Sequence, residues 1–357
     1  MQMQDNARQI QAFTFTGRGG EYFRIWIVNL ALTIVTLGIY SAWAKVRRLQ
    51  YFYRNTSLVG GSFDYHGEPL AILKGRLIGV GLLVAYNLSS GLSPILGLVV
   101  LAILMGVFPW LLQRSLCFRL GNSSYRGLRF SFDGTTGDSY KAFLLWPLLG
   151  YISLGLLMPL AHQRIKAYQH GNSRYGMSGF GFNAGPGGFY AIYGKMILLL
   201  FLMLLLPIVL FFTMGGMDLL SNLRNPYMSK QEQLALIGTI FMLIMGFYLL
   251  AFLFIGPWFT ARTQNLVWNA TVLGPHAFAS NVRARELLVI YLTNFIGILL
   301  TLGLFKPFAD IRLAKYRLEH MALQTEGDLN GFIADQTQAV GAAGEETAEV
   351  FDFDISF

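Results

Sequence analysis

Cysteine is almost absent from this chain, and acidic residues are missing from its apolar stretches. Cys117 is the single cysteine among 357 residues, which excludes an intramolecular disulfide and a cysteine-based metal site. The five histidines do not show the paired spacing of a helix-borne metal site. No nucleophile–base pattern and no phosphate-cradling loop stands out either. We therefore expect a protein that is not an enzyme and has no catalytic residues, no metal and no cofactor.

Basic residues are missing from the C-terminal end. No Lys or Arg follows Arg317, whereas eight acidic residues lie between Glu326 and Asp354. We expect residues 333–357 to be an acidic, disordered tail. The rest of the chain is then more basic than the formal net charge of +8 suggests. Residues 1–12 are polar and carry no hydrophobic core or cleavage pattern, so they do not resemble a signal peptide.

Long uncharged apolar runs dominate what remains. A helix needs about 20 apolar residues to cross the hydrocarbon of a bilayer, and several runs reach that length. A turn pattern, Asn87-Leu-Ser-Ser-Gly-Leu-Ser-Pro94, divides one of the longer runs. The sequence predicts a transmembrane domain over residues 13–332 with about seven spans, near residues 25–44, 77–90, 94–112, 142–161, 196–214, 234–259 and 286–305.

One pattern recurs five times beside these runs. Each copy is anchored on an arginine, namely Arg47, Arg114, Arg164, Arg262 and Arg312. A bulky apolar residue stands four positions earlier and is a tryptophan at Trp43, Trp110 and Trp258. An asparagine follows at Asn55, Asn122 and Asn172, and a phenylalanine at Phe63, Phe130, Phe180 and Phe278. Repetition at fixed offsets indicates one structural unit used several times.

The first copy shows what the unit contains. Thr36-Leu-Gly-Ile-Tyr-Ser-Ala-Trp43 is typical of a helix that stops and restarts. The restarted helix is aromatic and basic, as at a membrane surface. Thr56–His66 then has two short β-favouring pieces around Gly-Gly, which predicts a hairpin. The expected fold class is therefore mainly α: a polytopic membrane protein with repeated units of helix break, surface helix and β-hairpin at the interface.

Two questions about these units stay open in the sequence. The hairpins can each anchor helix ends at the interface, which we favour, or assemble into one small β-layer that binds something. The Gly-broken single spans can cross the membrane fully or re-enter the face they came from. Full crossing, which we slightly favour, divides five like units between two compartments. Re-entry keeps all of them on the cytoplasmic face.

The N-terminal part resembles a known family. The carrying residues are Phe13-Thr-Phe-Thr-Gly-Arg-Gly-Gly-Glu-Tyr-Phe23, Thr36–Arg48 and Phe63–Arg76, and the similarity extends to about Phe332. These segments resemble the YjgN family of bacterial inner-membrane proteins, a domain family of unknown function. Ala42 stands where a proline is usual in the family. The resemblance implies a multi-pass protein of the bacterial cytoplasmic membrane and supplies no catalytic or ligand-binding residues.

Transport is the function we favour from the sequence. Many spans, helix breaks and repeats are typical of a transporter or channel, here without intramembrane ionisable residues. The candidate polar residues at depth are Asn29, Asn87 and Asn294, which helix–helix hydrogen bonding also explains. The alternative is a non-catalytic, lipid-interacting or membrane-organising scaffold. Expected partners are membrane lipids with anionic headgroups and an unknown small molecule, and no nucleic acid.

Overall fold

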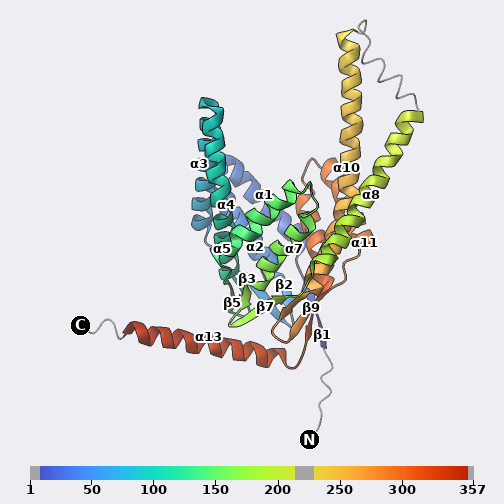
Figure 1. The fold of residues 1–357 in the computed structure, drawn as a ribbon. Helices are drawn as coiled ribbons and strands as arrows, with labels where there is room; N and C mark the ends of the chain where they lie inside the picture. The colour runs from blue at the N-terminus through green and yellow to red at the C-terminus, as the bar shows by residue number, and fades with distance from the viewer. Residues whose placement is uncertain (1–8, 214–228, 353–357) are drawn as a thin grey trace.

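A β-barrel forms the base of the protein, and helices rise from one of its ends (Figure 1). This computed structural model describes residues 9–213 and 229–352. The ten strands are short, three to seven residues each: β1 (Gln9–Phe15), β2 (Thr56–Leu58), β3 (Gly61–Tyr65), β4 (Ser123–Tyr125), β5 (Leu128–Phe132), β6 (Ser173–Tyr175), β7 (Ser178–Phe182), β8 (Thr271–Leu273), β9 (His276–Ser280) and β10 (Met321–Thr325).

The strands close into one antiparallel barrel in the order β1-β10-β9-β8-β7-β6-β5-β4-β3-β2. Four hairpins supply eight strands, and β1 pairs with β10 to bring together the two ends of the chain. The turns at Val59-Gly60 and Arg126-Gly127 have two consecutive positive φ angles, 47° and 71° in the first and 48° and 83° in the second. Such turns match the twist of the strands they join.

The expected fold class is wrong about the β-structure. We predicted a mainly α protein whose hairpins stand as separate units at the membrane interface, whereas the hairpins join with β1 and β10 in one closed ten-stranded barrel. A hairpin alone is marginal in water and leaves unpaired strand edges. Closing the barrel pairs those edges, and this long-range pairing is what a local sequence pattern does not show.

The helices leave and return to the barrel in pairs. They are α1 (Gly19–Val35) with α2 (Ser41–Arg54), α3 (Pro69–Leu92) with α4 (Pro94–Gly121), α6 (Trp146–Ile152) with α7 (Met158–Gly171), α8 (Pro186–Thr213) with α10 (Lys230–Asn269), and α11 (Ala284–Leu300) with α12 (Lys306–Glu319). Before α6 lie α5 (Thr136–Tyr140) and a π-helical turn, Lys141–Leu145. In four pairs the first helix directly follows a strand, and in the pair α6/α7 it follows α5 and the π-helical turn; the second helix of every pair precedes a strand.

Three of the pairs are short and end in the same kind of tip. Leu37, Leu154 and Leu302 adopt a left-handed φ of about 50° and are 94–95% exposed. Each is followed by a glycine that also has a positive φ, as the predicted helix breaks require. These three pairs occupy the regions where we predicted single spans near residues 25–44, 142–161 and 286–305.

Four helices are long and apolar enough to cross a membrane: Pro69–Leu92, Pro94–Gly121, Pro186–Leu205 and Lys230–Asn269. They overlap the predicted spans near residues 77–90, 94–112, 196–214 and 234–259, and they form the two tall helix pairs in Figure 1. Part of the predicted span at 196–214 and the loop that follows it lie outside the described residues.

The C-terminal segment lies on the opposite end of the barrel from the helix pairs (Figure 1). Where we expected a disordered tail from residue 333, the structure has a helix, α13 (Leu329–Asp352). Leu329 and Ile333 are buried against the barrel core, and Phe332 packs beside them. Apolar residues in the first turns of α13 therefore attach the acidic segment to the barrel.

Candidate functional site

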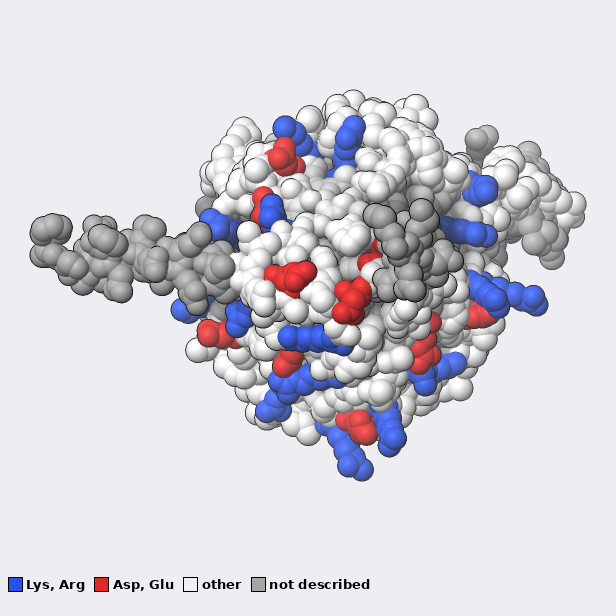
Figure 2. Space-filling model, turned by 90° about the horizontal axis from the view of Figure 1, so that it is seen from below, with Lys and Arg blue, Asp and Glu red and all other residues white. Residues whose placement is uncertain are grey.

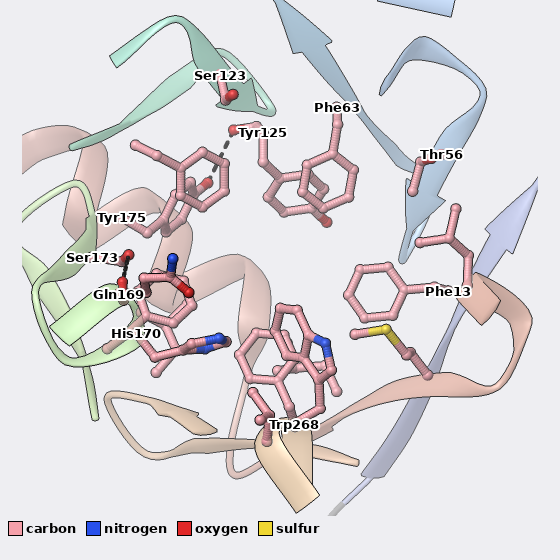
Figure 3. Close-up of a pocket in the computed structure, with 18 of the residues that line it drawn as sticks. Phe13, Thr56, Phe63, Ser123, Tyr125, Gln169, His170, Ser173, Tyr175 and Trp268 are labelled. Carbon is pink, nitrogen blue, oxygen red and sulfur yellow. Dashed lines mark hydrogen bonds between the residues drawn. The ribbon is translucent and has the colours of Figure 1, made fainter. Parts of the chain in front are cut away.

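A cavity of about 870 Å³ extends from the barrel interior to the ends of the helices above it. Its wall contains strand residues together with residues of α4, α7, α10 and α12, and residues of α13 lie at the far end. Figure 3 shows side chains from several strands and helices that converge on this space. A volume of this size is near the upper end of the range of small-molecule sites, about 300–1,000 Å³.

Five phenylalanines form a closed ring inside the barrel. The distances between neighbouring ring centroids are 6.1 Å for Phe13–Phe63, 6.4 Å for Phe63–Phe130, 6.4 Å for Phe130–Phe180, 6.0 Å for Phe180–Phe278 and 6.5 Å for Phe278–Phe13. Four of them are the recurrent phenylalanines of the sequence pattern, each the middle residue of a five-residue strand. The structure thus brings the four predicted phenylalanines together around one cavity.

Polarity changes along the axis of the cavity. At the helix end, Thr56, Ser123 and Ser173 line it, and each hydroxyl donates to a carbonyl of the last helical turn. Towards the turns of the hairpins the lining becomes apolar, with Leu58 and Leu273 among the residues there. The hydroxyls of Tyr125 and Tyr175 donate hydrogen bonds to the backbone carbonyls of Leu58 and Tyr125, at 2.6 Å and 3.1 Å. Their aromatic rings are therefore the main surface that they present to the cavity (Figure 3).

Three cations lie at the helix end of the cavity: Arg119 from α4, Lys166 from α7 and Arg317 from α12. Burial lowers the pKa of Lys166, and the positive charges of Arg119 and Arg317 lower it further. Burial also lowers the pKa of Arg317. None of the residues that line this cavity in the described part of the chain is an Asp or a Glu.

Two histidines border the same space and are held neutral. Burial, together with the charge of Lys166, lowers the pKa of His162 to about 4, and burial with Lys166 and Arg119 does the same for His170. The Nδ1 of His170 lies 3.1 Å from the hydroxyl of Thr271. Among the described residues, no group of three or more His, Cys, Asp or Glu side chains could hold a metal ion.

The predicted arginines lie outside the cavity. Arg47, Arg114 and Arg164 are exposed and lie over the rings of Tyr40, Trp110 and Trp146, at 5.7, 5.8 and 5.3 Å. Arg262 is exposed too, and Arg312 donates a hydrogen bond of 2.9 Å to Asn294. An arginine over an aromatic ring within about 6 Å is a favourable contact, and Trp and Tyr are enriched at membrane–water interfaces.

The predicted asparagines end helices. Asn55, Asn122 and Asn172 are the C-cap residues of α2, α4 and α7, and each amide donates 2.8 Å to a carbonyl four residues earlier. The carbonyls of Asn122 and Asn172 accept from the residues after β3 and β5, His66 and Asp133. These asparagines therefore join helix ends to the barrel and do not line the cavity.

The other predicted residues are also structural in position. Trp43 stacks on Tyr40 at 6.1 Å, and Trp258 is half-buried in α10. Asn29 and Asn294 are buried, whereas Asn87 is exposed and donates to the carbonyl of Leu83. The three asparagines lie on separate helices and outside the cavity lining.

The cavity cations were missed in the sequence. Arg119 and Arg317 stand five residues after the anchors Arg114 and Arg312, and Lys166 stands two after Arg164. A helix turns 100° per residue, so five residues lead to a different face of the helix. The sequence pattern that could have indicated these cavity cations is a second basic residue on another face of each of the three helices.

The comparisons with known proteins agree with the membrane helices. Residues 10–350 match a family described as "Bacterial protein of unknown function (DUF898)". The chain is similar to the inner membrane protein YjgN of Salmonella typhimurium, 30% identical over 145 residues, which are 40% of this chain and 37% of that protein. It is also similar to YjgN of Escherichia coli K12, 29% identical over 157 residues, which are 44% of this chain and 39% of that protein.

These matches cover well under half of the length of the curated relatives. No solved structure matches the chain. With relatives named as inner membrane proteins and four helices able to span a bilayer, the protein is located in the bacterial cytoplasmic membrane. The chain therefore belongs to the DUF898 family, and its resemblance to the YjgN family is confirmed.

Proposed function

We propose that this protein transports a small solute across or out of the membrane, with the barrel cavity as its binding chamber. The observation that carries the proposal is the cavity of about 870 Å³, which lies directly beneath the helix pairs and is lined by α4 and α10, two of the candidate spans. The barrel is closed, so it has no open sheet edge at its side. We therefore propose that the solute reaches the cavity from the helix end, between these helices.

The barrel restricts the topology that such a protein can adopt. Because all ten strands belong to one barrel, we propose that the barrel ends of all five helix pairs lie on one face of the membrane. We propose that α3/α4 and α8/α10 cross the bilayer and return, and that the three short pairs enter one leaflet by their exposed leucine tips. Almost all Lys and Arg then lie on the barrel face, which the positive-inside rule places in the cytoplasm.

The charge distribution of the barrel end supports this placement. Figure 2 shows Lys, Arg, Asp and Glu side chains intermingled over the face seen from below the barrel. Ion pairs also join surface side chains elsewhere on the protein, as in Arg54–Asp64 at 2.8 Å and Lys141–Asp138 at 3.0 Å. A surface of mixed, paired charge is typical of contact with water.

Labelling with a membrane-impermeant thiol reagent tests the topology. In a C117A background, Met177→Cys places a thiol on a hairpin turn of the barrel, and Leu92→Cys places one at the far end of α3; the native side chains are 52% and 80% exposed. We expect Met177→Cys to react only in inverted vesicles and Leu92→Cys only in right-side-out cells. Labelling of both from the same side would contradict the topology.

Flux from reconstituted vesicles tests transport. The probes are phenyl phosphate, phenyltrimethylammonium and inositol, each entrapped at the same concentration. We expect faster release of at least one probe than from protein-free vesicles. We also expect a bulky thiol reagent to block the release through Thr56→Cys, inside the cavity, while Leu92→Cys serves as the matched control outside it. Release no faster than from protein-free vesicles for all three probes would refute the proposal.

A lipid-interacting scaffold is the second candidate, and one groove favours it. The groove, of about 500 Å³, lies along α1 and α2 and is lined by Arg24 and Arg47 beside Ile25 and Val28. Arginines beside apolar residues at a membrane surface suit an anionic headgroup. If this is the function, R24Q/R47Q should lower the amount of phosphatidylglycerol that copurifies with the protein, and no variant should show flux.

A further inference from the structure

We infer that Arg119, Lys166 and Arg317 form a binding site, at the helix end of the barrel cavity, for an anion that carries an apolar group. The chemical class is an aryl or alkyl phosphate, phosphonate or carboxylate. The inference deepens the proposed function by naming the substrate class, and it rests on that function only where it treats the ligand as a transported solute.

Lys166 and Arg317 are half-buried, and Arg119, which is exposed, lines the same cavity. Lys166 donates 3.2 Å to Gln169, and the Nε of Arg317 donates 2.6 Å to Gln264. Both acceptors are neutral amides. Within residues 9–213 and 229–352, Arg119 makes no side-chain hydrogen bond and none of the three is in a salt bridge. Withdrawing an unpaired charge from water is costly, so the half-buried Lys166 and Arg317, in a cavity wall without Asp or Glu among the described residues, favour an anionic ligand.

Other arginines of the protein show the contrast. On the outer surface, Arg54 pairs with Asp64, Arg174 with Asp133 and Arg283 with Glu286. Carboxylates are thus available near arginines where the side chains face water. The cavity lining has no Asp or Glu among the described residues, so Arg119, Lys166 and Arg317 have no such carboxylate beside them.

Helix dipoles explain only part of the cluster. The C-terminal end of a helix favours cations within its last turn, and Arg119 and Arg317 lie in the last turns of α4 and α12. Lys166 lies five residues before the end of α7 at Gly171 and is beyond that range. No helix C-terminus therefore stabilises the charge of Lys166. Lys166 also lies close enough to both arginines for their charges to lower its pKa.

The remaining wall defines the rest of the ligand. Below the cations stand the hydroxyls of Thr56, Ser123 and Ser173, and below them the ring of five phenylalanines. Trp268 adds a further aromatic surface, 5.1 Å from the ring of Phe278. Figure 3 shows Trp268, Phe13 and Phe63 around the same space. A ligand with a charged head and an apolar or aromatic body matches this order of polarity, whereas a free inorganic anion uses only its upper part.

Arginine is suited to the head of such a ligand. Its planar fork donates two parallel hydrogen bonds to one phosphate or carboxylate group. The terminal nitrogens of Arg317 have no acceptor among the described residues, since only its Nε is engaged. Two arginines and one lysine can therefore surround a single oxyanion from three helices.

Isothermal titration of the full-length protein in a neutral detergent tests the inference. The titrants are phenyl phosphate, inorganic phosphate and benzyl alcohol. We expect phenyl phosphate to bind at least tenfold more tightly than inorganic phosphate or benzyl alcohol. Competition by phosphatidylglycerol in mixed micelles would identify a lipid headgroup as a ligand of this site, and its absence would identify a free organic anion. Equal binding of phenyl phosphate and benzyl alcohol would overturn the inference.

Variants assign the binding to these residues. We expect K166Q and R119Q each to lower the affinity for phenyl phosphate at least tenfold. R114Q, which removes an exposed arginine from the same helix as Arg119, is the matched control and should leave the affinity unchanged. If K166Q does not fold, R119Q provides the same test. Unchanged affinity in both, or an equal loss in R114Q, would overturn the assignment.

The two proposals fail in different ways. Binding of phenyl phosphate that depends on Lys166, without flux of any probe, contradicts transport and leaves the anion site in place. Flux of inositol or phenyltrimethylammonium that K166Q does not alter contradicts the anion site and leaves transport in place.

Discussion

Two buried asparagines occupy corresponding positions but have different hydrogen-bond partners. Asn29 and Asn294 are each the eleventh residue of a 17-residue helix, α1 and α11. The amide of Asn294 donates 3.2 Å to the carbonyl of Ala309, and its oxygen accepts 2.9 Å from Arg312. The side-chain oxygen of Asn29 is buried and has no partner among the described residues. Replacing each with leucine should therefore have opposite effects.

We expect N294L to destabilise the protein by about 2 kcal/mol. A neutral hydrogen bond contributes about 1 kcal/mol and one to a charged group about 1.5–3 kcal/mol. Because the guanidinium of Arg312 is exposed, water can replace part of the hydrogen-bond free energy that it loses when Asn294 is removed. N29L should be neutral or stabilising by up to about 1 kcal/mol, because it removes an unsatisfied buried oxygen.

Unfolding can be followed through the single cysteine. Cys117 packs beside the core cluster of Leu116, Phe132 and Tyr168, so a thiol-reactive dye reports when that region opens. At pH 7.5 in detergent, we expect N294L to lower the unfolding midpoint by about 3 °C and N29L to leave it unchanged or raise it. An equal loss in both variants, or a larger loss in N29L, would refute the reasoning from hydrogen-bond partners.

Three further outcomes follow from the structure. Burial holds the pKa of His162 and His170 near 4, below their ordinary 6.5, so the unfolded chain binds more protons in this window. Stability should fall as the pH drops from 6.5 to 4, by up to about 3 kcal/mol per histidine, and H162N/H170N should flatten this dependence in tryptophan-monitored melting. L154D should reduce the membrane-integrated fraction, because an aspartate in lipid costs about 3 kcal/mol; an unchanged fraction would place that tip in water. F332A removes the ring that packs on His276 at 4.7 Å, and it should make α13 cleavable at lower protease concentration, while equal cleavage of both proteins would show that α13 is not attached there.

Local features were predictable from the sequence because local residues cause them. The helix breaks at Leu37 and Leu302 follow from a Leu-Gly pair at the end of an apolar helix. The hairpin at Val59-Gly60 follows from glycine between two β-favouring segments. The phenylalanines at one offset share a role because they are the middle residues of equivalent strands.

The closed barrel was not predictable in the same way. Its closure depends on β1 and β10, which are about 300 residues apart in the chain and pair through Gln9 and Thr325. No pattern within either strand identifies the other. The cavity cations share this difficulty, because Arg119, Lys166 and Arg317 meet only when three helices converge on the barrel.

Cysteine cross-linking tests the closure of the barrel, on which the cavity and the topology depend. Ala12 of β1 pairs with Ala322 of β10, which in turn pairs with Ala279 of β9. In isolated membranes and a C117A background, we expect A12C/A322C and A279C/A322C to form a disulfide on mild oxidation. A12C/A279C, whose residues are separated by a whole strand, should not. Absence of the A12C/A322C disulfide, while A279C/A322C forms its own, would contradict a closed barrel.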